Sequence, residues 1–505
     1  MKPGLLHRLL ALTLVLGIPA LTIAAPEART PNGSFIGVDE GGVLAFKGIR
    51  YAEAPIGSRR WTSPRPVAKS RKPVTVSEFG PSCLQPPTPQ GVAVPGSEDC
   101  LFLNVWTPAT DDKLRPVMFW IHGGALRSGN GNIPGAILAA QDAVVVSINY
   151  RLGPLGFLAH PALRNKSANF AVDDMVLALK WVQDNIRAFG GNPHNVTIFG
   201  VSAGGQAVNL LMVNPDARGL FHKAIAQSGY AAWPLPRSAN APVPAPRRFD
   251  LGMADSAEDI SQKLVAKLTD KRQSARVLRN LDGQALVNAL EGFQMAIVDG
   301  TKLREEPAIL FAQGQQAAVP FITGGNSFEG SVMPGTGIST EDFARMLGDD
   351  FSALKDAYAP DFAVSNEQGV MRMFGDNRYL LSARLLANGM AAMKRESWLY
   401  YIDLGPAQNP QKWPGSPHGY DSVMLFGTDK ETNPGVRDLG VRLQQYWLAF
   451  ARKGKPDPEG LPKWPSYLPE TDRWMVFSER DGERTGVLKR KLDLLAARHT
   501  KRVQR

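Results

Sequence analysis

The residues best suited to chemistry surround Ser202. The stretch from Asn195 to Val213 reads NVTIFGVSAGGQAVNLLMV, and within it residues 200–204 form the pattern G-x-S-x-G. The apolar run before this pattern predicts a strand, and the apolar run after it predicts a helix. Such a strand–turn–helix context is typical of a nucleophilic serine in a strained turn, because the flanking glycines let neighbouring backbone pass closely. We expect Ser202 to be a nucleophile, with the backbone N–H of Ala203 directed at a bound carbonyl oxygen.

A serine hydroxyl is a weak nucleophile and needs a base to take its proton. The chain has seven histidines, and most lie in the leader, in the C-terminal tail, or close to Ser202 in sequence. His418 is different, because it lies beside Gly419 in a loop that follows a predicted strand ending at Leu404. In hydrolases whose serine lies in such a strand–turn–helix context, the catalytic residues follow the order serine, acid, histidine along the chain. We therefore expect His418 to be the base.

The acid that orients the base should lie between the serine and the histidine. Glu329 follows a predicted strand at 319–323 and so lies at the carboxyl end of a strand, where α/β active sites are built. Asp299 also lies in the allowed interval and remains an alternative. We expect Glu329 to be the acid.

The negative oxygen of a tetrahedral intermediate needs backbone N–H donors. The run His122-Gly123-Gly124-Ala125 follows a predicted buried strand, which is the usual place for an oxyanion loop. The expected donors are the N–H groups of Gly124, Ala125 and Ala203. We expect His122 to support this loop and to take no part in the reaction.

These residues need a scaffold, and strands alternate with helices along the chain. Strands are predicted at 101–106, 115–121, 143–150, 195–199, 223–227, 318–324, 397–404 and 474–478. Helices are predicted at 173–189, 255–292, 342–359, 372–394 and 436–454. This alternation predicts an α/β protein with a mostly parallel, doubly wound sheet and helices on both faces. We expect residues 26–505 to form one domain, in which 234–394 contains a helical lid that shapes the substrate pocket.

The N-terminal segment is typical of a secretory signal peptide, which we assign to residues 1–25. Lys2 and Arg8 supply positive charge, residues 9–23 are apolar, and small residues precede Pro26. The apolar run is short for a membrane span and contains Pro19, although a retained anchor is an alternative. No later segment is apolar enough to cross a bilayer. The sequence therefore predicts a secreted or periplasmic protein.

Charge and cysteine content narrow the possible partners. The net charge of +10 falls to about +8 without Lys2 and Arg8, a modest excess for 505 residues. The basic tail at 489–505 is interpreted as a solvated helix end and a frayed terminus, since no nucleic-acid-binding signature accompanies it. In an exported chain, the two cysteines, Cys83 and Cys100, predict one disulfide, and two buried free thiols are the alternative. No metal-binding pattern accompanies them.

Several longer motifs resemble those of the type-B carboxylesterase family, the cholinesterase-like branch of the α/β hydrolases. They occur in order over nearly the whole chain, which makes the resemblance specific. They are FKGIRYAEAPIG at 46–57, SEDCLFLNVWTP at 97–108, IHGGAL at 121–126, WVQDNIRAFGGNPHNVTIFGVSAGG at 181–205, AIAQSG at 224–229, HGYDSVMLFG at 418–427 and WPSY at 464–467.

The resemblance implies ester hydrolysis without a cofactor or a metal. It implies a catalytic triad of Ser202, Glu329 and His418. It also implies an oxyanion hole formed by Gly124, Ala125 and Ala203. Finally, it implies one disulfide, between Cys83 and Cys100. The expected function is that of an exported serine carboxylesterase acting on a small-molecule ester through an acyl-enzyme. Two alternatives remain, namely a non-catalytic binding protein of this fold and the same chemistry on an amide, thioester or lactone.

The chain departs from the family pattern in three places. Val201 replaces the glutamate that usually precedes the serine, and Ala125 replaces a third glycine in the oxyanion loop. The segment at 84–99 contains no aromatic residue, although a tryptophan in this loop is the usual contact for choline. These departures predict that quaternary ammonium esters are not preferred. The acyl and alcohol preferences and the oligomeric state do not follow from the sequence.

Overall fold

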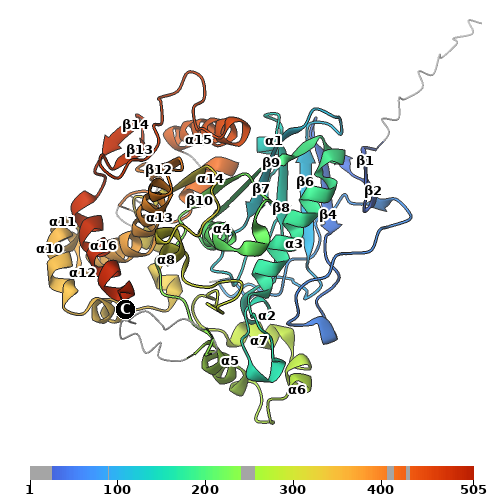
Figure 1. Cartoon of the computed structure of the whole chain (residues 1–505), viewed down its shortest axis with the longest axis horizontal. Coiled ribbons are helices and arrows are strands. Elements are labelled where there is room, and N and C mark those ends of the chain that lie inside the picture. The colour runs from blue at the N-terminus through green and yellow to red at the C-terminus, as the bar shows by residue number, and fades with distance from the viewer. Residues whose placement is uncertain are drawn as a thin grey trace, which may run out of the picture.

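The central feature of the computed structural model is an 11-stranded sheet that crosses the molecule (Figure 1). The structure describes residues 25–88, 90–239, 241, 256–406, 414–427 and 433–504. A second sheet of three strands, β1, β2 and β5, lies near the beginning of the described chain. The predicted leader, residues 1–25, lies outside the described residues except for its last residue.

The strands of the large sheet follow the order β14-β13-β12-β11-β10-β9-β7-β8-β6-β4-β3. Their bounds are β3 Val38–Asp39, β4 Leu44–Arg50, β6 Phe102–Thr107, β7 Arg115–Ile121, β8 Val144–Ile148, β9 Gly191–Val201, β10 Lys223–Gln227, β11 Phe321–Asn326, β12 Ser397–Ile402, β13 Arg473–Phe477 and β14 Gly482–Thr485. In the small sheet they are β1 Glu27–Thr30, β2 Gly33–Ile36 and β5 Val74–Thr75.

The middle of the large sheet is parallel, and its edges are antiparallel. The run from β13 to β8 in the strand order is parallel, whereas β14, β6, β4 and β3 pair antiparallel. This confirms the predicted mostly parallel sheet. The strand predicted at 318–324 in fact begins at Phe321, because Pro320 has no N–H to donate to a neighbouring strand.

Helices cover both faces of the sheet, as predicted. One face packs against α3 Phe170–Asn185, α4 Ala203–Val213, α8 Pro307–Ala312 and α13 Leu381–Ala392. The other packs against α1 Ala136–Ala139, α14 Tyr420–Phe426 and α15 Pro434–Lys453. Strand β7 shows why two layers form, since Phe119 and Ile121 point into the first apolar cluster while Met118 and Trp120 point into the second.

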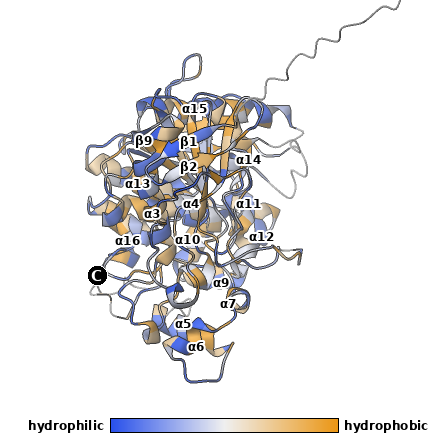
Figure 2. Ribbon diagram, turned by 90° about the vertical axis from the view of Figure 1, so that its right-hand side faces the viewer, coloured by the Kyte–Doolittle hydropathy of each residue, from blue (hydrophilic) through white to orange (hydrophobic). Residues whose placement is uncertain are grey.

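Most of the other helices lie between β10 and β12 in the chain. They are α5 Ala257–Ala266, α6 Ala275–Arg279, α7 Gly283–Ala289, α9 Thr340–Leu347, α10 Asp350–Ala357, α11 Ala359–Val364 and α12 Asn366–Gly375, while the short α2 Gly153–Gly156 precedes α3. The group α5–α7 lies at the end of the molecule opposite α15 (Figures 1 and 2). The helix predicted at 255–292 is therefore three short helices, because Ser274 and Asp282 each cap a new N-terminus.

Two other predicted helices are also interrupted. The helix predicted at 342–359 is broken at Gly348, which has a φ of 56°. Glycine adopts this angle readily, but a right-handed helix cannot continue through it, so the helix ends there. The one at 372–394 contains a π-helical turn, Asp376–Leu380, between α12 and α13. This turn carries Arg378 and Tyr379, two buried side chains whose neighbours are described below.

The interpretation of residues 489–505 as a solvated helix end and a frayed terminus is right about the helix but wrong about its exposure and its extent. Helix α16, Lys489–Val503, extends almost to the end of the chain, and its Leu492 and Leu495 are fully buried. Arg502 is also buried, where its guanidinium pairs with Glu306 at 2.5 Å. The basic residues of the tail are split between an exposed face and a buried face that docks on the domain. No helix among the described residues is long and apolar enough to span a membrane.

Candidate active site

Ser202 lies in a strained turn between β9 and α4. Its backbone has φ of 57° and ψ of −119°, a conformation that non-glycine residues rarely adopt. The Ser202 N–H donates to the carbonyl oxygen of Gln227 at 2.8 Å, which ties the turn to the neighbouring strand. A side chain on Gly200 or Gly204 would collide with the carbonyl oxygen of Ile121. Glycine is therefore required on both sides, as the sequence pattern predicts.

The structure brings Ser202, His418 and Glu329 into one hydrogen-bonded chain. The Oγ atom of Ser202 lies 2.8 Å from Nε2 of His418. On the other side of the ring, Nδ1 of His418 makes a short hydrogen bond to Oε2 of Glu329. With the Nδ1 proton facing the carboxylate, Nε2 is the acceptor for the serine hydroxyl. The predicted nucleophile, base and acid thus have the geometry that proton transfer needs.

The second oxygen of the Glu329 carboxylate is held by residues that the sequence analysis missed. Oε1 accepts a hydrogen bond from Oγ of Ser228 at 2.6 Å and from the backbone N–H of Asn326 at 2.6 Å. Ser228 directly follows β10, and Asn326 ends β11. The sequence did contain a signal for both residues, because each is a polar residue at the end of a predicted parallel strand. Fixed on both oxygens, the carboxylate cannot rotate away from His418.

The histidine ring is also held from its face. The ring of Tyr379 lies 4.4 Å from the ring of His418, and the backbone N–H of His418 donates to Oγ of Ser331 at 2.8 Å. Burial raises the pKa of Tyr379 well above its ordinary value. Tyr379 therefore remains a neutral packing surface for the imidazole at physiological pH.

Asp299, the alternative acid, lies in a different environment. Its carboxylate accepts hydrogen bonds from the side chain of Asn169 and from the backbone N–H groups of residues 301–303. These contacts stabilise the turn that contains Asp299. The carboxylate that contacts the His418 ring is that of Glu329 and not that of Asp299.

The predicted oxyanion donors lie beside the serine. Gly124 and Ala125 both have positive φ, at 102° and 58°, and their N–H groups have no acceptor among the described residues. Ala203 is the first residue of α4, where N–H groups have no partner within the helix. His122 stacks on Tyr150 with its ring centroid 4.3 Å away, and burial lowers its pKa to about 4. His122 is therefore neutral at pH 7, and it packs beneath the oxyanion loop, as expected.

Ser202, His418, Gly124 and Ala125 line one cavity of about 600 Å³. Val201, one of the positions where the sequence departs from the family pattern, also lines it. Cys83 and Cys100 form a disulfide, and the loop that they close forms part of the cavity wall. Gln85, from this loop, accepts from the Gly129 N–H at 2.9 Å and so attaches the loop to the oxyanion segment.

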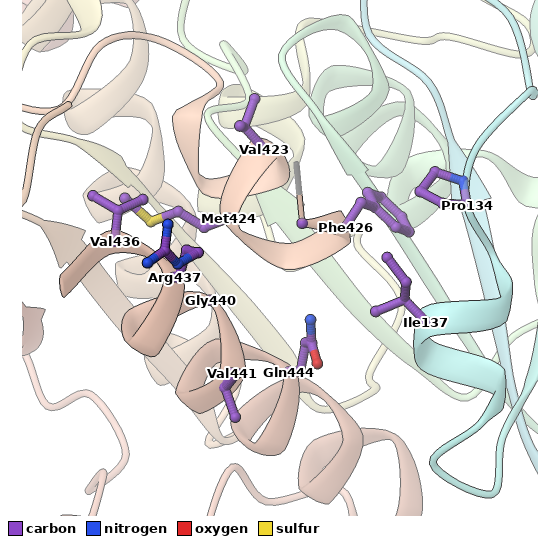
Figure 3. A pocket seen from close by; sticks show the side chains of 11 residues that line it. Pro134, Ile137, Val423, Met424, Phe426, Val436, Arg437, Gly440, Val441 and Gln444 are labelled. Carbon is purple, nitrogen blue, oxygen red and sulfur yellow. The ribbon is translucent and has the colours of Figure 1, made fainter. Parts of the chain in front are cut away.

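A second hollow, of about 430 Å³, lies between α1, α14 and α15 (Figure 3). Apolar side chains such as Ile137 and Val441 surround it, and it contains none of the three residues of the hydrogen-bonded chain. Within the described ranges, no group of three or more His, Cys, Asp or Glu side chains is arranged to hold a metal ion.

The sheet with helices on both faces and the serine in a strand–turn–helix junction define an α/β hydrolase. The sequence model of the carboxylesterase family matches residues 24–494 of this chain. The fumonisin B1 esterase of Sphingopyxis macrogoltabida is 32% identical, with 95% of this chain and 92% of that protein aligned. The para-nitrobenzyl esterase of Bacillus subtilis is also 32% identical, with 89% and 94% aligned.

Solved structures give the same result. A Geobacillus stearothermophilus carboxylesterase superposes with a TM-score of 0.79 at 28% identity, over 93% of this chain and 99% of that one. A PNB esterase superposes with a TM-score of 0.77 at 30% identity, over 93% and 100%. The chain therefore belongs to the carboxylesterase family, and it is a carboxylic-ester hydrolase of type B.

Proposed function

We propose that the protein is an exported serine carboxylesterase with Ser202 as nucleophile, His418 as general base and Glu329 as the acid that orients it. The observation that carries this proposal is the unbroken chain from Ser202 Oγ to His418 Nε2, at 2.8 Å, and from His418 Nδ1 to Glu329. In the first half of the reaction, Oγ attacks the ester carbonyl while His418 takes its proton.

The carbonyl oxygen then becomes negative and accepts hydrogen bonds from the N–H groups of Gly124, Ala125 and Ala203. Losing one such donor costs about 3 kcal/mol of transition-state stabilisation in a comparable enzyme. His418 returns its proton to the departing alcohol, which leaves an ester between the acyl group and Ser202. Because backbone N–H groups make this site, replacement of a third glycine by Ala125 keeps the donor.

Water completes the cycle. His418 takes a proton from a water molecule, the hydroxide attacks the acyl-enzyme, and the acid product leaves with Ser202 restored. Throughout, the Glu329 carboxylate favours the protonated form of His418, because an opposite charge beside the ring stabilises the imidazolium. The hydrogen bonds from Ser228 and Asn326 keep that carboxylate in place.

Two further parts of the proposal concern location and reaction class. Export is supported by the leader-like segment at 1–25 and by a disulfide, a bond that persists in oxidising compartments. A non-catalytic binding role is disfavoured, because it does not require three reactive side chains in mutual contact. An amide, thioester or lactone would follow the same chemical steps, so only a substrate panel separates these from ester hydrolysis.

The deciding experiment compares the native protein with Ser202→Ala. Hydrolysis is measured over p-nitrophenyl esters of graded acyl length, and labelling is measured with a fluorophosphonate probe. The native protein should hydrolyse the esters and be labelled, and Ser202→Ala should do neither while melting at the same temperature. Full turnover in Ser202→Ala would rule out this nucleophile.

A further inference from the structure

The wall of the active-site cavity carries a positive charge without a matching negative one. Among the described residues that line the cavity, Arg127 is the only arginine or lysine, and no aspartate or glutamate is present. Arg127 lies two residues after Ala125, so the oxyanion loop itself brings the charge next to the reacting ester. At Val201, where relatives usually carry a carboxylate, this chain has an apolar side chain.

Among the described residues, the one hydrogen-bond partner of Arg127 is neutral. Its Nη1 donates to the carbonyl oxygen of Gly292 at 2.9 Å, and its Nε is buried without an acceptor among the described residues. Two other arginines of this chain with little exposed surface pair with carboxylates, Arg60 with Glu98 and Arg151 with Asp174. A guanidinium carries five N–H donors, so Arg127 retains capacity to bind an anion.

A second arginine lies behind the same part of the wall. Arg378 is 2% exposed, and its guanidinium carbon lies 4.4 Å from the ring of Trp233, 4.5 Å from that of Tyr230 and 5.3 Å from that of Phe293. Within the described ranges it makes no ion pair with a carboxylate, and its Nε has no acceptor. Cation–π contacts with the rings hold the charge in place without neutralising it.

The two arginines flank one short segment. Gly292 accepts the hydrogen bond from Arg127, and the next residue, Phe293, lines the cavity on one side and contacts Arg378 on the other. The carboxylate of Glu329 is buried and hydrogen-bonded to His418. In a cavity with low-dielectric walls, unopposed positive charge raises the local concentration of anions.

We propose that the cavity selects esters that carry a carboxylate, which the guanidinium of Arg127 binds while Arg378 adds to the positive potential. This proposal rests on the proposed function, since it names the substrate class of the same site. A carboxylate suits Arg127 because charge-assisted hydrogen bonds to a guanidinium are the strong ones and can be bidentate. The carboxylate can be on the acyl or the alcohol side of the ester.

The test uses matched pairs of esters, one pair for each side. On the acyl side, p-nitrophenyl hydrogen adipate is compared with p-nitrophenyl hexanoate, in which a methyl replaces the carboxylate. On the alcohol side, carboxyphenyl butyrate is compared with carbamoylphenyl butyrate. In at least one pair, the native protein should favour the charged ester by about tenfold or more in kcat/KM, mainly through KM, and added salt should reduce this ratio.

The variants assign the effect to Arg127. Arg127→Gln should lower the charged-to-neutral ratio about tenfold, and Arg127→Lys should retain part of it because the charge remains. Arg218→Gln is the matched control, since among the described residues Arg218 also donates only to a backbone carbonyl, that of Gln315, but is exposed outside the cavity. It should leave the ratio unchanged. Adipate, used as an inhibitor of hexanoate hydrolysis, should lose potency in Arg127→Gln and not in Arg218→Gln.

Two results would overturn the proposal. One is a native protein that shows no preference for the charged ester in either pair. The other is an Arg127→Gln variant that melts like the native protein and keeps the native ratio. Failure of the proposed function is distinguishable from both, because then neither ester of a pair is hydrolysed by a Ser202-dependent route.

Discussion

At the scale of single residues, the carboxylate of Glu329 shows how one group is divided between two tasks. One oxygen contacts the His418 ring, and the other accepts from Ser228 and Asn326. Glu329, Ser228 and Asn326 are buried, so a rotated carboxylate would lose hydrogen bonds that water cannot replace. The orientation of the base therefore depends on residues that never contact the substrate.

Glu329→Gln should reduce kcat strongly, because the amide cannot stabilise a protonated His418 and favours the wrong tautomer. The equivalent change in a comparable triad lowers kcat by about 10⁴-fold. Asp299→Asn is the matched comparison. It should lower the melting temperature, because Asp299 accepts several hydrogen bonds in its turn, and should change kcat little. If Asp299→Asn reduced kcat more than Glu329→Gln did, the acid would have to be reassigned.

At the scale of elements, α16 contributes stability that its composition does not suggest. It is rich in lysine and arginine, yet Leu492 and Leu495 are fully buried. Arg502 forms two hydrogen bonds with the carboxylate of Glu306, which precedes α8, and one with the carbonyl oxygen of Ala232. The helix thus joins the C-terminus to the region between β10 and β11.

Arg502→Ala should destabilise the fold by about 3–5 kcal/mol, because it leaves Glu306 buried without its counter-ion. Arg490→Ala, on the exposed part of the same helix, should change the free energy of unfolding by less than about 0.5 kcal/mol. Both values come from urea unfolding followed by circular dichroism. Equal stabilities of the two variants would show that the Arg502–Glu306 pair is dispensable.

At the scale of the whole molecule, the disulfide and the net charge both affect the active-site cavity. The bond between Cys83 and Cys100 links positions 17 residues apart and fixes a loop that lines the cavity. The chain as a whole is positive, at +10. Both features act on the cavity, one by shaping its wall and the other by its long-range field.

In the native protein, Cys83 and Cys100 should be bonded to each other. Thiol titration of a denatured, non-reduced sample should find no free thiol, and two free thiols would contradict the prediction. Replacing both cysteines with alanine should lower stability by about 3 kcal/mol in the chain-entropy model, since the closed loop is short. The loop contacts Gly129 through Gln85, so KM should change as well.

Choline esters should not be preferred over neutral esters of equal acyl length. The described part of the disulfide loop offers no aromatic ring, Val201 replaces a carboxylate, and Arg127 repels a cation. Phe293 does line the cavity, but its ring already contacts the guanidinium of Arg378 at 5.3 Å. The measurement compares kcat/KM for butyrylcholine and 3,3-dimethylbutyl butyrate. An advantage of about tenfold, or 1.4 kcal/mol, for the choline ester would contradict this expectation.

The sequence by itself determined which residue types stand where along the chain. The turn at Ser202, the glycine-flanked His418 and the oxyanion loop were predictable because each depends on neighbours within a few positions. The sheet was predictable for the same reason, since strands such as β7 and β10 are apolar runs bounded by breakers. At α16 the basic composition led to a wrong expectation of a solvated tail. Which of its basic residues are buried depends on their helical periodicity and not on composition.

Only the tertiary structure decided which of these residues meet. Ser202 and His418 are 216 positions apart, and Glu329 contacts His418 where Asp299 does not. Ser228 joins this contact because β10 and β11 are adjacent and parallel in the sheet, which places their carboxyl ends side by side. Likewise, Arg127 and Arg378 share one segment, Gly292–Phe293, through packing between distant parts of the chain. Local pattern determines conformation, but contacts across the sheet depend on strand order and register, which no short stretch of sequence contains.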